Sequence, residues 1–69
     1  MRDIFADVSV KGCVTFTAET ERGRAWMGRW YHETTRTYAT DNPIERAEAE
    51  RFRKQAAADQ IDVYDLMSN

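Results

Sequence analysis

The residue types that most often carry out chemistry are scarce in this chain. Cys13 is its only cysteine and His32 its only histidine. A structural zinc site uses about four cysteine or histidine ligands, and a cysteine nucleophile needs a base together with a third group that orients that base. We therefore expect no metal site, and we interpret Cys13 and His32 as structural rather than catalytic residues.

Two pairs of carboxylates are candidates for proton transfer, namely Glu48 with Asp59 and Asp62 with Asp65. General acid and base catalysis needs a dry pocket that shifts pKa values, but a chain of this length buries only about 60% of the surface that it exposes when unfolded. The three glycines also lack the spacing of a phosphate-binding loop. The sequence therefore predicts no catalytic residue, no cofactor and no enzymatic activity.

Arginine and aromatic side chains are the best candidates for a binding surface. Eight of the ten basic residues are arginine, whose guanidinium makes bidentate and stacked contacts that lysine cannot make. Tryptophan, tyrosine and arginine also dominate the residues that contribute most to protein interfaces. The predicted partner-binding residues are Arg22, Arg29, Trp30, Tyr31, Arg36 and Tyr38.

Most of that set depends on a helix that we expect to be capped by Thr17. The Thr17 hydroxyl suits an N-cap, and Glu19 and Glu21 place negative charge at the positive end of the helix dipole. At about 100° per residue, one arc about 140° wide holds the large apolar side chains and is predicted to be the buried face. The residues of this arc are Trp26, Met27, Trp30 and Tyr31.

Gly23 lies in the middle of the same arc. A glycine inside a helix costs about 1 kcal/mol relative to alanine. Its position predicts a close approach between this helix and the strands before it, which would compensate for that cost. The sequence leaves open whether Trp26 and Trp30 fill the core or extend beyond it as a surface for a partner protein or a second copy of the chain.

Residues 16–26, which include Gly23-Arg24-Ala25-Trp26, resemble a pattern found in short uncharacterised bacterial and phage proteins. In that group a strand is followed by a Thr-capped helix with Gly-Arg-x-Trp, and then by a second helix and a short strand. The resemblance implies a bacterial or phage protein, but no activity, cofactor or site residue.

The strands before the helix are predicted to form an antiparallel hairpin. Apolar residues alternate from Ile4 to Val10, and the residues around Val14 favour strands. A loop from Lys11 to Cys13 pairs Val10 with Val14 and unites the apolar residues on one face, whereas a two-residue loop separates them. We therefore predict the three-residue loop, although such loops prefer glycine at their last position.

The second half of the chain contains one clear helix start. Asn42 is a good N-cap, Pro43 suits the first helical position, and Glu45 can reach back to the cap amide. We expect a helix from Pro43 to about Asp59, anchored by Phe52. Residues 34–40 are either an edge strand or an ordered loop, residues 61–66 alternate like a strand that returns to the hairpin, and residues 67–69 are expected to be a frayed tail.

Together these elements predict a small α+β domain spanning residues 1–69. An antiparallel hairpin within a sheet of two to four strands packs against two helices, in the order β-β-α-(β)-α-β. The formal charge of −2 provides no general attraction to nucleic acid or to an anionic membrane. A single cysteine and the lack of a long apolar segment favour a cytoplasmic protein with no membrane partner.

By elimination, the sequence favours a non-enzymatic protein-interaction module. We expect it to act as an accessory factor of a phage or mobile element that modulates a host protein, with a homodimer as one form of partnership. The alternative is a small nucleic-acid-associated regulator that uses Arg22, Arg29 and Arg36 as a basic strip. The identity of the partner cannot be inferred from these residues.

Overall fold

The computed structural model describes residues 2–65, which form four strands and two helices. In chain order these are β1 (Ile4–Ser9), β2 (Cys13–Ala18), α1 (Glu21–Tyr31), β3 (Thr35–Ala39), α2 (Pro43–Ala58) and β4 (Val63–Asp65). The predicted α+β class and the predicted order of elements are confirmed, with residues 35–39 forming an edge strand. Leu66 of the predicted last strand and the expected tail at residues 67–69 lie outside the described residues.

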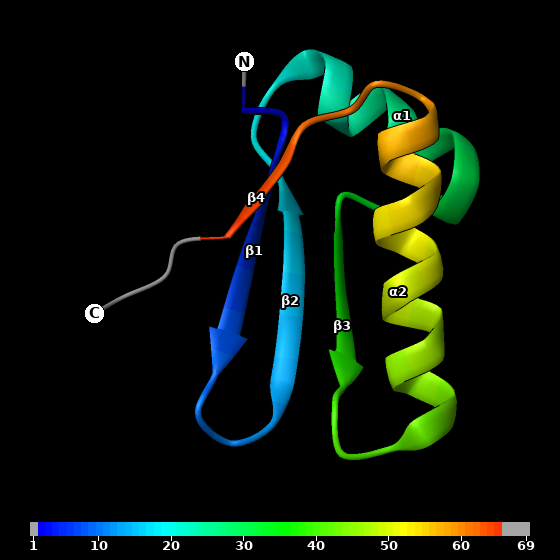
Figure 1. Cartoon of the computed structure of the whole chain (residues 1–69). Coiled ribbons are helices and arrows are strands. Elements are labelled where there is room, and N and C mark those ends of the chain that lie inside the picture. Colours follow the sequence, from blue (N-terminus) through cyan, green and yellow to red (C-terminus); the bar gives the residue numbers. More distant parts are fainter. Residues whose placement is uncertain (1, 66–69) are drawn as a thin grey trace.

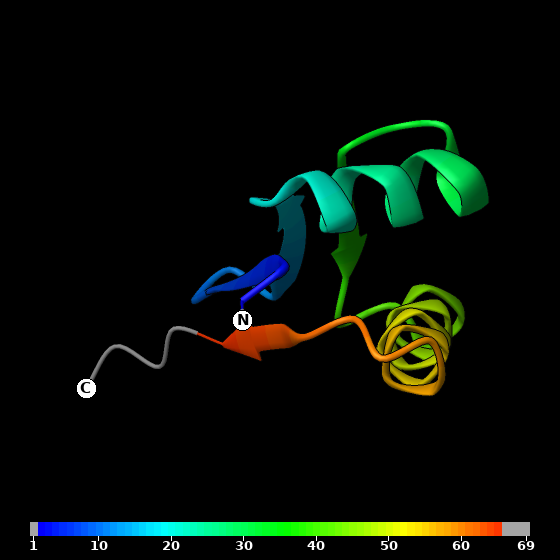
Figure 2. The same ribbon diagram turned by 90° about the horizontal axis from the view of Figure 1, so that it is seen from above.

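The strands form one mixed sheet in the order β3-β2-β1-β4. β2 is antiparallel to both of its neighbours, whereas β4 runs parallel to β1. α1 crosses the end of the sheet where β1 begins and β2 ends, and α2 runs beside the sheet over its length (Figures 1 and 2). The hydrophobic core therefore lies between one face of the sheet and the two helices.

The predicted hairpin register is wrong by two residues. Val14 pairs with Val8 instead of Val10, and the three-residue loop starts one residue earlier than expected, at Val10–Gly12. Gly12 adopts φ +86° at the last loop position, where a three-residue hairpin needs a left-handed residue. A shift of two residues keeps every side chain on the same face, so hydrophobic alternation could not distinguish the two registers.

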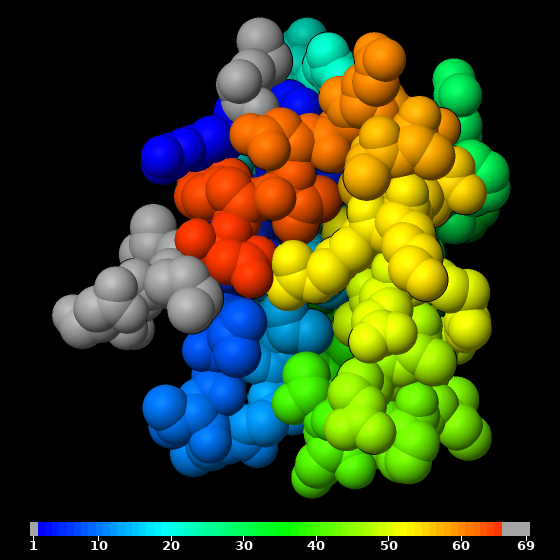
Figure 3. Space-filling view, viewed as in Figure 1, coloured from blue at the N-terminus to red at the C-terminus, as the bar shows by residue number. Residues whose placement is uncertain are grey.

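β1 extends past β4 toward the hairpin loop, because β4 pairs only with Ile4, Phe5 and Ala6. The space-filling view shows the hairpin end of β1 and β2 standing apart from the N-terminal half of α2 (Figure 3). Val8 is accordingly 54% exposed, and Val10 is fully exposed in the loop. Val14 of β2, which pairs with Val8, is only 3% exposed, so the exposed apolar side chains at this end belong to β1 and the loop.

The predicted start of the first helix is also wrong. Thr17 belongs to β2, where it pairs with Phe5 on one side and Thr35 on the other, and Thr20 is the N-cap. The Thr20 hydroxyl accepts a hydrogen bond from the Gly23 N–H at 3.0 Å. Both threonines can cap a helix, and sheet pairing between distant parts of the chain selects the second.

Asp3 joins the beginnings of β1, α1 and β4, and we call this site the Asp3 junction. Its buried carboxylate accepts hydrogen bonds from the Thr20 hydroxyl at 2.7 Å and from the Asp62 N–H at 3.1 Å. Its backbone N–H donates to the Asp62 carbonyl, and its carbonyl accepts from the Glu19 N–H. The Arg22 Nε lies 3.7 Å from the same carboxylate.

The electrostatics of the Asp3 junction favour the ionised acid. Burial by itself raises the pKa of Asp3, but the hydrogen bonds from Thr20 and Asp62 and the charge of Arg22 outweigh it, so the pKa lies below the ordinary value of 3.8. Asp3 is therefore a charged, fully paired residue at neutral pH.

Gly23 provides the close approach that the sequence predicts. A Cβ atom at this position would lie 2.3 Å from the carbonyl oxygen of Asp3, far inside van der Waals contact. Only glycine lets α1 lie against the backbone of the first strand. The contact is with the residue just before β1 rather than with the middle of the hairpin.

The second helix begins as predicted but uses Glu45 differently. The Asn42 side chain accepts hydrogen bonds from the Ile44 and Glu45 N–H groups, which confirms the cap. The Glu45 carboxylate accepts instead from the Ala39 N–H at 2.8 Å and so ties the helix start to the end of β3. The helix ends at a left-handed Gln60 (φ +60°), whose N–H donates back to the carbonyl of Ala57.

Phe52 is the centre of the core, as predicted from its place on α2. Phe52 is fully buried. Its ring stacks on the ring of Phe16 in β2, with 4.1 Å between the ring centroids, and on the ring of Tyr31 in α1, with 5.2 Å between the centroids. Trp26 meets it edge to face at 5.1 Å. This aromatic cluster connects both helices to the sheet and thereby sets the distance between them.

Candidate functional site

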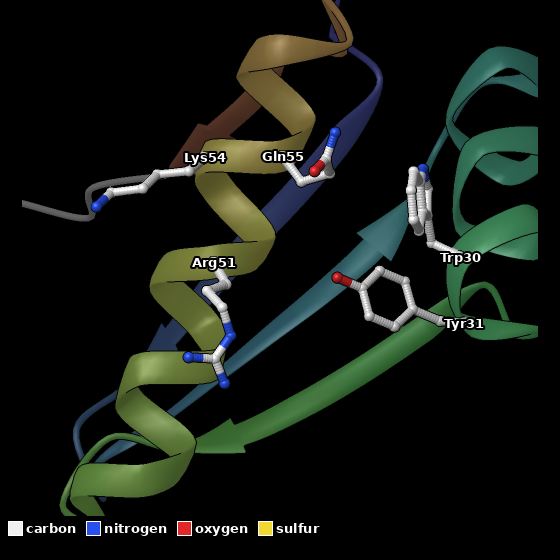
Figure 4. A pocket seen from close by; sticks show the side chains of 5 residues that line it. All are labelled: Trp30, Tyr31, Arg51, Lys54 and Gln55. Carbon is white, nitrogen blue, oxygen red and sulfur yellow. The ribbon is translucent and has the colours of Figure 1, made fainter.

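An open groove of about 380 Å³ lies between the end of α1 and the middle of α2. Figure 4 shows the rings of Trp30 and Tyr31 projecting from α1, with Gln55 and Arg51 across the gap on α2 and Lys54 extending away from the two rings. The groove therefore combines aromatic surface, two cations and an amide, a mixture typical of recognition sites.

The two tryptophans have different environments although they are one helical turn apart. Trp26 is 7% exposed, and its indole N–H donates to the Asp59 carboxylate at 2.7 Å. Trp30 is 50% exposed. Trp26 and Tyr31 already occupy the space around Phe52, so no room remains there for the second indole.

Tyr31 forms the aromatic floor of the groove. One side of its ring packs on Phe52, and the Arg36 guanidinium lies 4.9 Å from its ring centre. Burial raises the pKa of the Tyr31 phenol, with the neighbouring Tyr38 and Glu48 adding to that rise and Arg36 opposing it. The phenol is therefore protonated near neutral pH and is able to donate a hydrogen bond.

The groove side of α2 carries polar residues in the order acidic, basic, amide, acidic. Glu48, Arg51, Gln55 and Asp59 are spaced by three or four residues and share one helical face. Asp59 accepts hydrogen bonds from the indole of Trp26 and from the Gln55 amide at 3.2 Å, and these bonds lower its pKa. The groove thus has a cation at its middle and a carboxylate at each end.

The basic residues differ in whether a carboxylate lies within ion-pair distance of them. Arg22, Arg36 and Arg53 form ion pairs with Asp3, Glu33 and Asp65, respectively. Within residues 2–65 no such pair involves Arg51 or Lys54. Their charges are therefore available to a ligand.

Two of the predicted partner-binding residues, Trp30 and Tyr31, line this groove. Arg29 is exposed on α1 and borders a smaller hollow beside Trp26. Tyr38 is only 3% exposed, so it is a core residue and offers no surface to a partner.

The expected basic strip is not formed, because its arginines point to different partners. Arg22 lies against Asp3 and donates to the carbonyl of Gln60. Arg36 donates to the Tyr38 hydroxyl at 2.7 Å and to Glu33 at 2.6 Å. Only Arg29 of the three is exposed without a hydrogen bond or an ion pair among the described residues.

Sequence analysis missed Arg51, Lys54 and Gln55. A signal was present, because Arg51 and Gln55 flank the predicted anchor Phe52 on one side of the helix. What the sequence does not contain is the choice of which flank of α2 faces α1.

The other candidate groups remain separate. Cys13 begins β2, whereas His32 caps α1 near the opposite end of that strand. Glu48 and Asp59 sit eleven residues apart on α2, about 16 Å along the axis, and Asp65 pairs with Arg53 instead of Asp62. No cluster of three or more metal-ligating side chains occurs between Arg2 and Asp65.

A second surface is the sheet face that points away from the core. Thr15 and Thr37 share a hydrogen bond across β2 and β3 at 3.0 Å, and Phe5 packs on Tyr64 at 5.4 Å. Its side chains are mainly hydroxyl-bearing, with Thr15, Thr17, Thr35 and Thr37 on β2 and β3. Neither helix in the described part of the chain has the length and apolar character needed to cross a membrane.

No family model, curated protein or solved structure gives a significant match to this chain.

Proposed function

We propose that this protein is a non-enzymatic interaction module that binds a partner protein through the groove between α1 and α2. The observation that carries the proposal is the half-exposed Trp30 beside Arg51, which forms no ion pair with any of residues 2–65. About half of the Trp30 side chain is exposed to water, so its burial contributes less to stability than it could, in a domain whose core is small. A partner that covers Trp30 would recover that contribution.

The groove also suits the energetics of a protein interface. Tryptophan, tyrosine and arginine contribute most to such interfaces when a partner excludes water from them. Here Trp30, Tyr31 and Arg51 adjoin one another on two helices whose spacing is fixed by Phe52. A rigid site of this kind needs little ordering on binding.

The biological setting of the proposal follows from the sequence. The resemblance of residues 16–26 to bacterial and phage proteins supports an accessory factor that modulates a host protein, and the single cysteine supports a reducing compartment such as the cytoplasm. A second copy of this chain is one form that the partner can take.

The alternative, a nucleic-acid regulator with an arginine strip, receives less support. Arg22 and Arg36 are both held by carboxylates within the chain. Phosphate binding would have to compete with those internal pairs, so the observation favours a protein partner.

Affinity capture with four tagged variants tests the proposal. We expect Trp30→Ala and Arg51→Glu each to lose a specific captured protein that the wild type retains. Two controls change residues outside the groove. Ile44→Ala removes an exposed apolar side chain from α2, and Lys11→Glu reverses a charge in the hairpin loop, and we expect both variants to retain the captured protein.

Light scattering on the same variants identifies self-association. A wild-type dimer that Trp30→Ala converts to a monomer would show that the partner is a second copy. Capture and oligomeric state that are the same in all four variants would refute the groove as the binding site.

A further inference from the structure

We infer that the occupant of the groove is an acidic peptide segment in which carboxylate side chains flank an aromatic side chain. This inference rests on the proposed function and specifies the chemistry of the partner. It follows from three features of the groove: an exposed indole, unpaired cations and an amide acceptor.

The first feature is the planar surface. Trp30 offers an indole face at the rim, and Tyr31 continues that surface toward α2 (Figure 4). An aromatic side chain of the partner can stack on such a surface and bury its own ring. Trp30 stands on a formed helix, so stacking orders little of the backbone of this chain.

The second feature is the position of the cations. Arg51 and Lys54 lie on the α2 side of the groove, and among residues 2–65 no carboxylate pairs with either. A guanidinium binds a carboxylate through two parallel hydrogen bonds when the site is partly shielded from water. Arg51 can therefore hold one acidic side chain of the peptide, and Lys54, which extends away from the two rings, adds a longer-range attraction (Figure 4).

The third feature distinguishes a peptide from a nucleic acid. The Gln55 amide nitrogen donates to Asp59, which fixes the orientation of the amide and leaves its oxygen as a hydrogen-bond acceptor. A peptide backbone supplies N–H donors to such an acceptor, whereas a phosphodiester backbone has none.

Nuclear magnetic resonance on the intact chain tests this inference, because its two indole N–H signals report Trp26 and Trp30 separately. The probe is the pentapeptide Ser-Asp-Phe-Asp-Ser, acetylated and amidated at its ends. We expect a saturable shift of the Trp30 signal, with affinity about tenfold weaker for the matched peptide Ser-Asn-Phe-Asn-Ser, which lacks the charges.

Matched variants locate the charge that matters. Arg51→Gln should weaken binding of the acidic peptide by about tenfold, and Arg24→Gln, in the first half of α1 and outside the lining of the groove, should leave it unchanged. Arg51→Glu should in addition reverse the preference toward Ser-Lys-Phe-Lys-Ser.

Three results would overturn the inference: equal binding of the acidic and amide peptides, no shift of Trp30 with either, or tighter binding of a single-stranded oligothymidylate. If the peptides fail while affinity capture still depends on Trp30 and Arg51, only the acidic chemistry is wrong. If the oligothymidylate shifts Trp30 in a salt-dependent manner and capture is unaffected by both variants, the proposed protein-binding function is wrong as well.

Discussion

The two ends of helix α1 differ in how completely their groups are satisfied. At the Asp3 junction, Gly23 touches backbone, and the Asp3 carboxylate has a partner on each oxygen. At the groove, Trp30 is half in water and Arg51 has no carboxylate beside it. The contacts at the Asp3 junction stabilise the fold, whereas the groove keeps an aromatic surface and a cation that another molecule can contact.

The contrast teaches how so small a domain divides its surface. Buried side-chain nitrogen and oxygen atoms all have hydrogen-bond partners within residues 2–65, so none of the polar groups needed for folding lacks one. Among residues 2–65 the exposed cations that form no ion pair include Arg51 and Lys54, which share the groove with the half-exposed Trp30. Because the buried polar atoms of residues 2–65 all have hydrogen-bond partners, exposed polar groups without partners are the candidates for binding another molecule.

The largest expected effect is at Gly23. Replacing it in Gly23→Leu forces a side chain against the Asp3 carbonyl, and we expect a loss of at least about 3 kcal/mol in the free energy of unfolding. Chemical denaturation followed by circular dichroism measures it. The gain in helix propensity, about 1 kcal/mol, works in the opposite direction and is too small to compensate.

Gly28 supplies the matched control on the same helix. A Cβ atom there would meet nothing within 4 Å, so Gly28→Ala should stabilise the protein by about 0.5 to 1 kcal/mol. Similar responses at the two glycines would remove the distinction between the two ends of α1.

The next effect is at the carboxylate of the junction. Asp3→Ala leaves the Thr20 hydroxyl and the Asp62 N–H without their acceptor and removes the partner of Arg22. We expect a loss of about 2 to 3 kcal/mol in the free energy of unfolding, measured by denaturation at neutral pH. A loss below about 0.5 kcal/mol would mean that water replaces the carboxylate and that the junction is not a stability centre.

The pH dependence of stability gives an independent measure of the same residue. Because folding lowers the pKa of Asp3, its contribution is complete above the ordinary pKa of 3.8 and is lost as the pH falls through the lower folded value. The stability difference between the wild type and Asp3→Asn should therefore be constant from about pH 7 to pH 5 and shrink below about pH 3.8. A difference that grows on acidification would have the wrong sign for this mechanism.

Much of the fold could be predicted because its signals are local. The Asn42 and Pro43 helix start and the alternating strands depend on residues near one another in the chain, and the position of Gly23 on the apolar arc of its helix is likewise visible in the sequence, although its contact is with the distant Asp3. The helix start at Thr20 could not, because pairing of Thr17 with Phe5 and Thr35 is decided by distant segments. The hairpin register was decided by the left-handed Gly12, a signal that hydrophobic alternation overrode in the prediction.

The site was predictable only on its α1 side. Trp30 and Tyr31 follow from composition and helical spacing, but the facing cations depend on how Phe52 orients α2 against α1. Tyr38 was assigned to the surface because an edge strand has no clear buried face in sequence, yet its ring packs on Phe16 and Phe52. Tertiary packing, rather than residue type, separates core aromatics from exposed ones here.

The smallest expected effect is the sharpest test of the comparison. Truncation of a buried aromatic residue costs about 3 to 5 kcal/mol, but Trp30→Ala should cost no more than about 1 kcal/mol, because half of its surface is already in water. Denaturation at neutral pH measures the change, with Trp26 retained as the fluorescent reporter of the core. A loss above about 2 kcal/mol would mean that Trp30 supports the fold as Trp26 does. The groove would then be a packing defect at the edge of the core, and its aromatic wall would no longer argue for a partner.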